Sequence, residues 1–118
     1  MNNVTLLAVD LAKNVFQLYA ADIRGKTVFE RRIRRDTLLE LIPKINKCNV
    51  YMEGCGSANY WGRKFIEFGH QVKLINPKYV KAYVKRNKTD RNDSYAIASA
   101  ARDPKMTFGE VKTEAQQD

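Results

Sequence analysis

The stretch Val4-Thr5-Leu6-Leu7-Ala8-Val9-Asp10 determines the fold that the sequence predicts. It is apolar at successive positions, which is typical of a central β-strand covered on both faces. The strand ends on a carboxylate, so Asp10 is expected at the edge of the core. The run is too short for a membrane helix or a signal segment, and no basic leader precedes it. We therefore expect a cytoplasmic protein with no membrane partner.

Working outward, the sequence predicts a mixed sheet with helices on its faces. Strands at 15–21 and 26–33 would form a hairpin around the link 22–25. Thr37 and Glu40 form a capping box for a helix that Pro43 would kink or split. The remaining elements alternate: strand 49–53, a helix capped by Ser57 and stopped by Gly69, strand 71–75, a helix beginning at Pro77, and a helix from Asp90 to just before Pro104.

This order predicts an α/β fold of the ribonuclease-H-like type, with a five-stranded mixed sheet whose later strands are parallel. Residues 1–104 would form the domain, and the polar residues 105–118 would form a tail or linker. The formal net charge of +8 favours nucleic acid as a partner. Two cysteines and one histidine fit no zinc motif.

Four carboxylates are predicted to meet at one end of this sheet. Asp10 and Glu53 end neighbouring strands, where α/β proteins place their sites. Asp90 and Asp93 lie three residues apart and would share one helix face. Taken singly, each acid is more simply a polar strand end or a helix cap. Together they form an oxygen-rich cluster that suits Mg²⁺ or Mn²⁺, the ions that support phosphoryl displacement in two-metal sites.

At these residues the sequence resembles the DEDD transposases of bacterial insertion sequences and the related Piv invertases, in their RuvC-like N-terminal domain. The resemblance spans nearly the whole chain and rests on four segments: Ala8-Val9-Asp10-Leu11-Ala12-Lys13, Met52-Glu53-Gly54-Cys55-Gly56-Ser57 with Tyr60-Trp61, Asn76-Pro77, and Lys88-Thr89-Asp90-Arg91-Asn92-Asp93 with Ala96. Two mild departures, Gly54-Cys55 and the pair Arg91-Asn92, remove no acid.

The resemblance implies that Asp10, Glu53, Asp90 and Asp93 are the catalytic residues and the ligands of Mg²⁺ or Mn²⁺. The implied activity is DNA strand cleavage and joining during transposition, by a recombinase with RuvC-like nuclease chemistry. Family members are longer, and their C-terminal domain carries a serine nucleophile that this sequence lacks. The resemblance also implies DNA as the substrate, a structured guide RNA as a partner and a homo-oligomeric full-length protein.

A basic stripe is predicted on the helix that begins near Pro77. Its members recur at three- and four-residue steps toward Asp90, opposite Val80, Tyr83 and Val84. They are Lys78, Lys81, Lys85 and Lys88. The stripe is interpreted as a track for nucleic-acid phosphates, with an ordinary solvated lysine face as the alternative.

Several features stay open between two interpretations. A second basic run, Arg31-Arg32 and Arg34-Arg35, is divided between phosphate contact and plain surface. Tyr60 and Trp61 are expected to pack in the core instead of stacking on bases. The main rival function is a non-catalytic nucleic-acid-binding module of the same fold. A sugar-kinase or actin-like ATPase is disfavoured, because residues 11–14 offer no phosphate-cradling loop.

Overall fold

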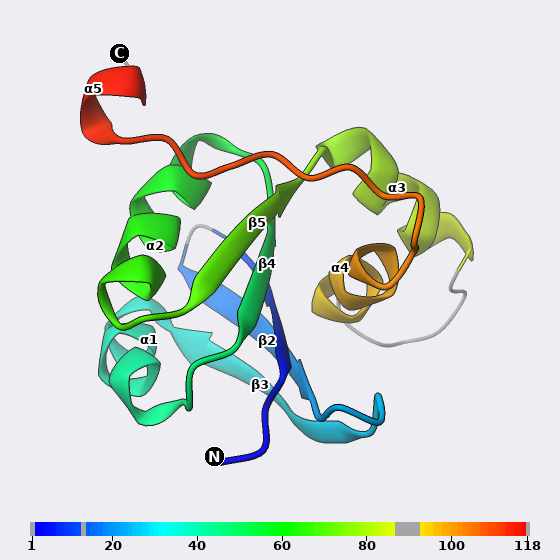
Figure 1. The fold of residues 1–118 in the computed structure, drawn as a ribbon, viewed down its shortest axis with the longest axis horizontal. Coiled ribbons are helices and arrows are strands. Elements are labelled where there is room, and N and C mark those ends of the chain that lie inside the picture. Colours follow the sequence, from blue (N-terminus) through cyan, green and yellow to red (C-terminus); the bar gives the residue numbers. More distant parts are fainter. Residues whose placement is uncertain (1, 13, 87–92, 118) are drawn as a thin grey trace.

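The computed structural model describes residues 2–12, 14–86 and 93–117. Within them lies one five-stranded sheet, in the order β3-β2-β1-β4-β5 (Figure 1). Its strands are β1 (Leu6–Asp10), β2 (Val15–Ala21), β3 (Thr27–Arg34), β4 (Asn49–Glu53) and β5 (Gln71–Ile75). Strands β1, β2 and β3 are antiparallel neighbours, whereas β1, β4 and β5 run parallel. This confirms the predicted ribonuclease-H-like fold.

Helices cover both faces of the sheet, which explains why β1 is apolar at every interior position. The helical elements are α1 (Arg35–Leu41), the 3₁₀ turn η1 (Ile42–Lys44), α2 (Gly56–Glu67), α3 (Pro77–Arg86), α4 (Asp93–Ala101) and α5 (Glu114–Gln117). Leu7 and Val9 pack with α1 and α2 on one face, while Ala8 packs with α3 and α4 on the other (Figure 1). None of the described helices is long and apolar enough to cross a membrane.

Two predicted helix starts are wrong. Helix α1 begins at Arg35, because β3 passes directly into it, and Thr37 therefore lies inside the first turn. Helix α2 begins at Gly56 with Cys55 as its N-cap, so Ser57 is not the cap. The predicted break at Pro43 is confirmed by the turn η1. Each start depends on where the preceding segment ends, and sequence propensity alone does not fix that point.

The aromatic side chains of α2 and its C-cap are not all buried. Trp61 and Phe65 are fully buried, but Tyr60 is 39% exposed and Phe68 is 47% exposed. Tyr60 lies beside the charged side chain of Lys64, whose Nζ is 5.6 Å from the ring centroid. Phe68 is the C-cap residue and has left the helical conformation. Core packing is therefore confirmed for Trp61 and wrong for Tyr60.

The segment that follows Pro104 lies against the domain over residues 108–112, where the sequence suggested a linker. Gly109 and Leu74 exchange two backbone hydrogen bonds of 2.8 and 2.9 Å, which cover the outer edge of β5. Phe108 packs on Tyr51, with ring centroids 5.4 Å apart. Val111 packs on the core cluster beneath α2. The proposed boundary at residue 104 stays a prediction.

Candidate metal centre

Asp10 and Glu53 lie at the carboxyl ends of two adjacent parallel strands. Strand β1 pairs with β4 so that Val9 lies opposite Met52, which brings the two acids to the same level of the sheet. Because side chains alternate along a strand, Asp10 shares a face with Ala8, and Glu53 shares that face with Tyr51. Both carboxylates therefore project on the face that α3 and α4 cover, and both are partly buried.

Asp93 is the third of the predicted ligands that the structure describes. It is the first residue of α4 and is exposed. Its backbone N–H donates a hydrogen bond of 3.2 Å to Oε1 of Gln17. Gln17 lies directly opposite Asp10 in the antiparallel pair of β1 and β2. A single glutamine thus connects the start of α4 to the strand beside Asp10.

Sequence reasoning missed Gln17. Its position in the chain carries no signal, since a glutamine on a strand is ordinary until the register of the hairpin is known. The register places it in the same row as Asp10, and its amide satisfies one of the N–H groups that a helix leaves unpaired at its first turn. Gln17 therefore links the first turn of α4 to β2.

The electrostatics of this corner are unfavourable for negative charge. The pKa of Asp10 is raised from its ordinary value of 3.8 to about 6. Burial is the largest cause, and the negative charges of Asp93 and Glu53 add to it. The three carboxylates therefore lie within electrostatic range of one another, and either a proton or a cation would relieve their repulsion.

The donor set fits a hard divalent cation, because it consists of carboxylate oxygens. Among the described residues, however, no three acidic, histidine or cysteine side chains lie close enough to form a metal-binding group. The fourth predicted ligand, Asp90, lies outside the described residues, so the predicted shared helix face of Asp90 and Asp93 is untested. The structure brings Asp10, Glu53 and Asp93 to one corner without closing a ligand shell.

The structure describes the side chains of two of the four lysines in the predicted stripe. Lys78 and Lys81 are exposed on α3, while the side chain of Lys85 and all of Lys88 lie outside the described part of the chain. Val80 is buried as predicted, but Val84 is 40% exposed. Tyr83 is half-buried against the core cluster of this face, and its hydroxyl donates a hydrogen bond of 2.6 Å to Asp103.

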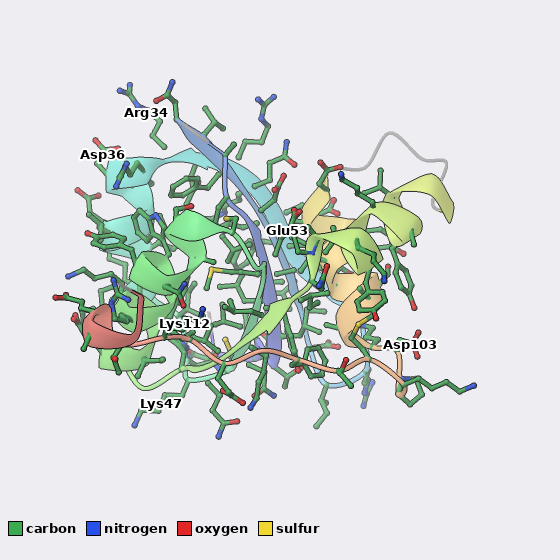
Figure 2. All side chains as sticks on the ribbon, turned by 90° about the horizontal axis from the view of Figure 1, so that it is seen from above. Arg34, Asp36, Lys47, Glu53, Asp103 and Lys112 are labelled. Carbon is green, nitrogen blue, oxygen red and sulfur yellow. The ribbon has the colours of Figure 1, made fainter. Side chains whose placement is uncertain are left out.

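A groove of about 840 Å³ begins beside Glu53, beyond the ends of β4 and β5. It is lined by the turns that follow these strands, by Tyr79 of α3 and by Phe108 of the C-terminal segment. Figure 2 looks onto this end of the sheet and shows Glu53 between the helices of the two faces. The groove starts at Gly54, the residue after Glu53, but Asp10, Glu53 and Asp93 do not line it.

The fold and the acidic strand ends place the chain among RuvC-like domains of the ribonuclease-H-like fold. A family model described as a transposase, for DEDD transposases of the IS110 type, matches residues 7–118. The chain belongs to this family, which confirms the resemblance predicted from the sequence.

Curated relatives agree along the whole chain. It is 45% identical over 118 residues to the transposase for insertion sequence element IS1111A of Coxiella burnetii, covering 100% of the chain and 32% of that protein. It is 42% identical over 115 residues to a probable family 20 transposase of Pseudomonas aeruginosa, covering 98% and 34%. It is 40% identical over 117 residues to the transposase for IS1328 of Yersinia enterocolitica, covering 99% and 35%. The chain thus spans about a third of each relative.

Proposed function

We propose that this chain is the metal-dependent catalytic domain of a DNA transposase, and that it contributes to DNA strand cleavage and joining. Asp10, Glu53, Asp90 and Asp93 would hold Mg²⁺ or Mn²⁺. The observation that carries the proposal is the convergence of Asp10, Glu53 and Asp93 at one corner of the sheet, where the pKa of Asp10 is raised to about 6. Perturbed acids of this kind concentrate at functional sites, where a substrate or cation offsets their cost.

Different residues of the chain would have different roles in this function. A bound divalent cation would supply the positive charge that activates an oxygen nucleophile and stabilises a leaving oxygen at phosphorus. Asp10 would give up its proton to the solvent and present a carboxylate. Gln17 would hold the first turn of α4, so that Asp93 faces the same corner. The cover of α4 over β1 and β2 would keep bulk water from one side of the acids.

The remaining parts of the proposal concern the longer protein. Residues 1–104 would be the catalytic domain, and residues 105–118 would lead toward a second transposase domain that carries a serine nucleophile. DNA would be the substrate, a structured guide RNA a partner, and the full-length protein a homo-oligomer. Membership of the family supports DNA as the substrate, and coverage of about a third of the relatives supports a longer protein. The domain boundary, the serine nucleophile, the guide RNA and the homo-oligomer rest on the sequence pattern and the resemblance alone.

One observation favours the rival function, a non-catalytic nucleic-acid-binding module. In the described ranges the acids do not form a closed group that could hold a metal. If that arrangement persisted in solution, the acids would only shape the surface. The rival therefore predicts a chain that binds DNA and does not bind Mn²⁺ at this corner.

Calorimetric titration with Mn²⁺ separates the two functions. The wild-type chain should bind Mn²⁺, Asp10→Asn and Glu53→Gln should abolish binding, and Glu40→Gln, which removes an exposed carboxylate on α1, should bind as wild type. Equal Mn²⁺ binding by wild type and Asp10→Asn would show that Asp10 is not a ligand of the metal. If the folded wild-type chain did not bind Mn²⁺ either with or without DNA, the non-catalytic nucleic-acid-binding module would be the better interpretation.

A further inference from the structure

Two arginines of β3 lie in register with the acidic corner. Across the sheet, Asp10 is opposite Gln17 on β2, and Gln17 is opposite Arg32 on β3. Residues opposite one another in a sheet project on the same face, so Arg32 shares the face of Asp10. Arg34, two residues further along β3, projects on that face as well. We call Arg32 and Arg34 the β3 arginine strip.

The strip lies on an open part of this face. Helix α4 packs over β1, β2 and β4, while β3 is the edge strand and pairs only with β2 in the described sheet. Both arginines are exposed. At the end of β3, Arg34 also borders a hollow of about 710 Å³ beside the start of α1, where the other lining residues are Asn14, Val15, Arg35, Asp36 and Leu39. Figure 2 shows Arg34 at the margin of the molecule, at the end of the sheet that also carries Glu53.

The neighbouring arginines differ from the strip. The guanidinium of Arg31 lies 5.0 Å from the ring centroid of Phe29, and that of Arg35 lies 5.7 Å from the ring of Trp61. Phe29 and Trp61 belong to the core cluster of the opposite face. In the described part of the chain, neither Arg32 nor Arg34 has an ion pair with an acid. The four arginines between residues 31 and 35 thus fall into two pairs: Arg31 and Arg35 lie against aromatic rings, and Arg32 and Arg34 are available to an anion.

The spacing suits a polyanion. Side chains two residues apart on a strand are separated by about 7 Å, which is roughly the rise of two nucleotides along the axis of duplex DNA. Neighbouring strands lie about 4.8 Å apart, so the backbone of Arg32 is roughly 10 Å from that of Asp10. A guanidinium can contact a phosphate with two parallel hydrogen bonds. A DNA strand that touches the strip would therefore reach the acids within a few nucleotides.

We propose that the β3 arginine strip, Arg32 and Arg34, binds phosphates of the DNA strand that enters the acidic corner. This strand would approach along the side of α4 that faces away from α3. This deepens the proposed function and rests on it for the identity of the substrate. It places a phosphate contact on the sheet, separate from the lysines of α3. The contact is independent of DNA sequence, because it involves backbone phosphates and no base edges.

The test is a DNA titration of the double variant Arg32→Gln/Arg34→Gln. The matched control is Arg24→Gln/Lys26→Gln, which removes two exposed charges from the other end of the same hairpin. Binding of a labelled DNA duplex is measured by fluorescence anisotropy in EDTA, at salt concentrations between about 50 and 200 mM. An RNA hairpin of equal length is titrated in parallel, and circular dichroism verifies that each variant is folded.

The strip variant should bind DNA about tenfold to a hundredfold more weakly, with a salt slope shallower by about 2, while the control changes the slope by much less. Equal effects in the two variants would overturn the proposal. Loss of RNA binding with unchanged DNA binding would overturn the assignment to DNA. Because EDTA removes metal, this outcome is independent of the Mn²⁺ titration, and failure of one proposal is distinguishable from failure of the other.

Discussion

Replacing Asp10 with Asn is expected to stabilise the metal-free protein at neutral and alkaline pH. In the folded chain Asp10 keeps its proton up to about pH 6, because burial and the charges of Asp93 and Glu53 oppose ionisation. In the unfolded chain the carboxyl would lose its proton near its ordinary pKa of 3.8. Asn has the shape of Asp10 and no charge, so it removes the cost of ionisation.

The sign and the size of the effect follow from linkage. Between the two pKa values the folded state binds more protons than the unfolded state, so this group's contribution to stability falls as the pH rises from 3.8 to about 6. Above that interval the full cost is present. At about 1.4 kcal/mol for each pH unit, the upper limit of the cost is about 3 kcal/mol, and solvent screening of this partly exposed carboxylate lowers the actual cost below that limit.

Urea denaturation of wild type and Asp10→Asn in EDTA, followed by circular dichroism from pH 3 to about pH 8, measures this difference. The variant should be more stable at pH 8 by up to about 3 kcal/mol and equal to wild type below the ordinary pKa of the carboxyl. Glu40→Gln on the exposed side of α1 serves as the control. A variant no more stable than wild type at pH 8 would refute the account of a crowded, partly buried acid.

Three further predictions concern other parts of the molecule. Gln17→Leu should lower the free energy of unfolding by about 1 kcal/mol and speed hydrogen exchange at the N–H of Asp93, which NMR can follow. Unchanged exchange would mean that Gln17 does not hydrogen-bond this N–H. The double variant Lys78→Ala/Lys81→Ala should bind unrelated DNA sequences more weakly to a similar extent, and the salt dependence of its DNA binding should have a slope shallower by about 2. An unchanged slope would mean that these lysines are ordinary solvated surface residues. Cys55 is exposed and should react with a thiol reagent in the native protein. Cys48 is buried, with its pKa raised by burial to about 11, and should react only on unfolding; equal rates would contradict its placement.

The sequence predicted the sheet well, because burial on both faces leaves a direct pattern. Residues 15–21, 49–53 and 71–75 were predicted as strands with the observed bounds. The pairing of β1 with β4, which brings Asp10 beside Glu53, followed from the order of elements. These features depend on hydrophobic pattern and connectivity, both of which a single sequence contains.

Other features depend on register and on contacts distant in sequence. The row that joins Asp10, Gln17 and Arg32 exists only because the β2–β3 hairpin pairs in one register, with an irregularity near Ala21. The attachment of Gly109 to β5 uses backbone groups, so the polar character of the C-terminal segment concealed it. Neither feature has a local signal that could have predicted it.

The central claim is that Asp10, Glu53, Asp90 and Asp93 hold a divalent cation, and a crystal structure of the protein soaked in Mn²⁺ tests it most directly. The anomalous signal of manganese locates the ion without reference to activity. The account predicts an ion bound to carboxylate oxygens of Asp10 and Glu53, with Asp93 or Asp90 completing the site, and no ion there in crystals of Asp10→Asn. Manganese found only at other carboxylates of the surface, with these acids apart and unligated, would contradict it.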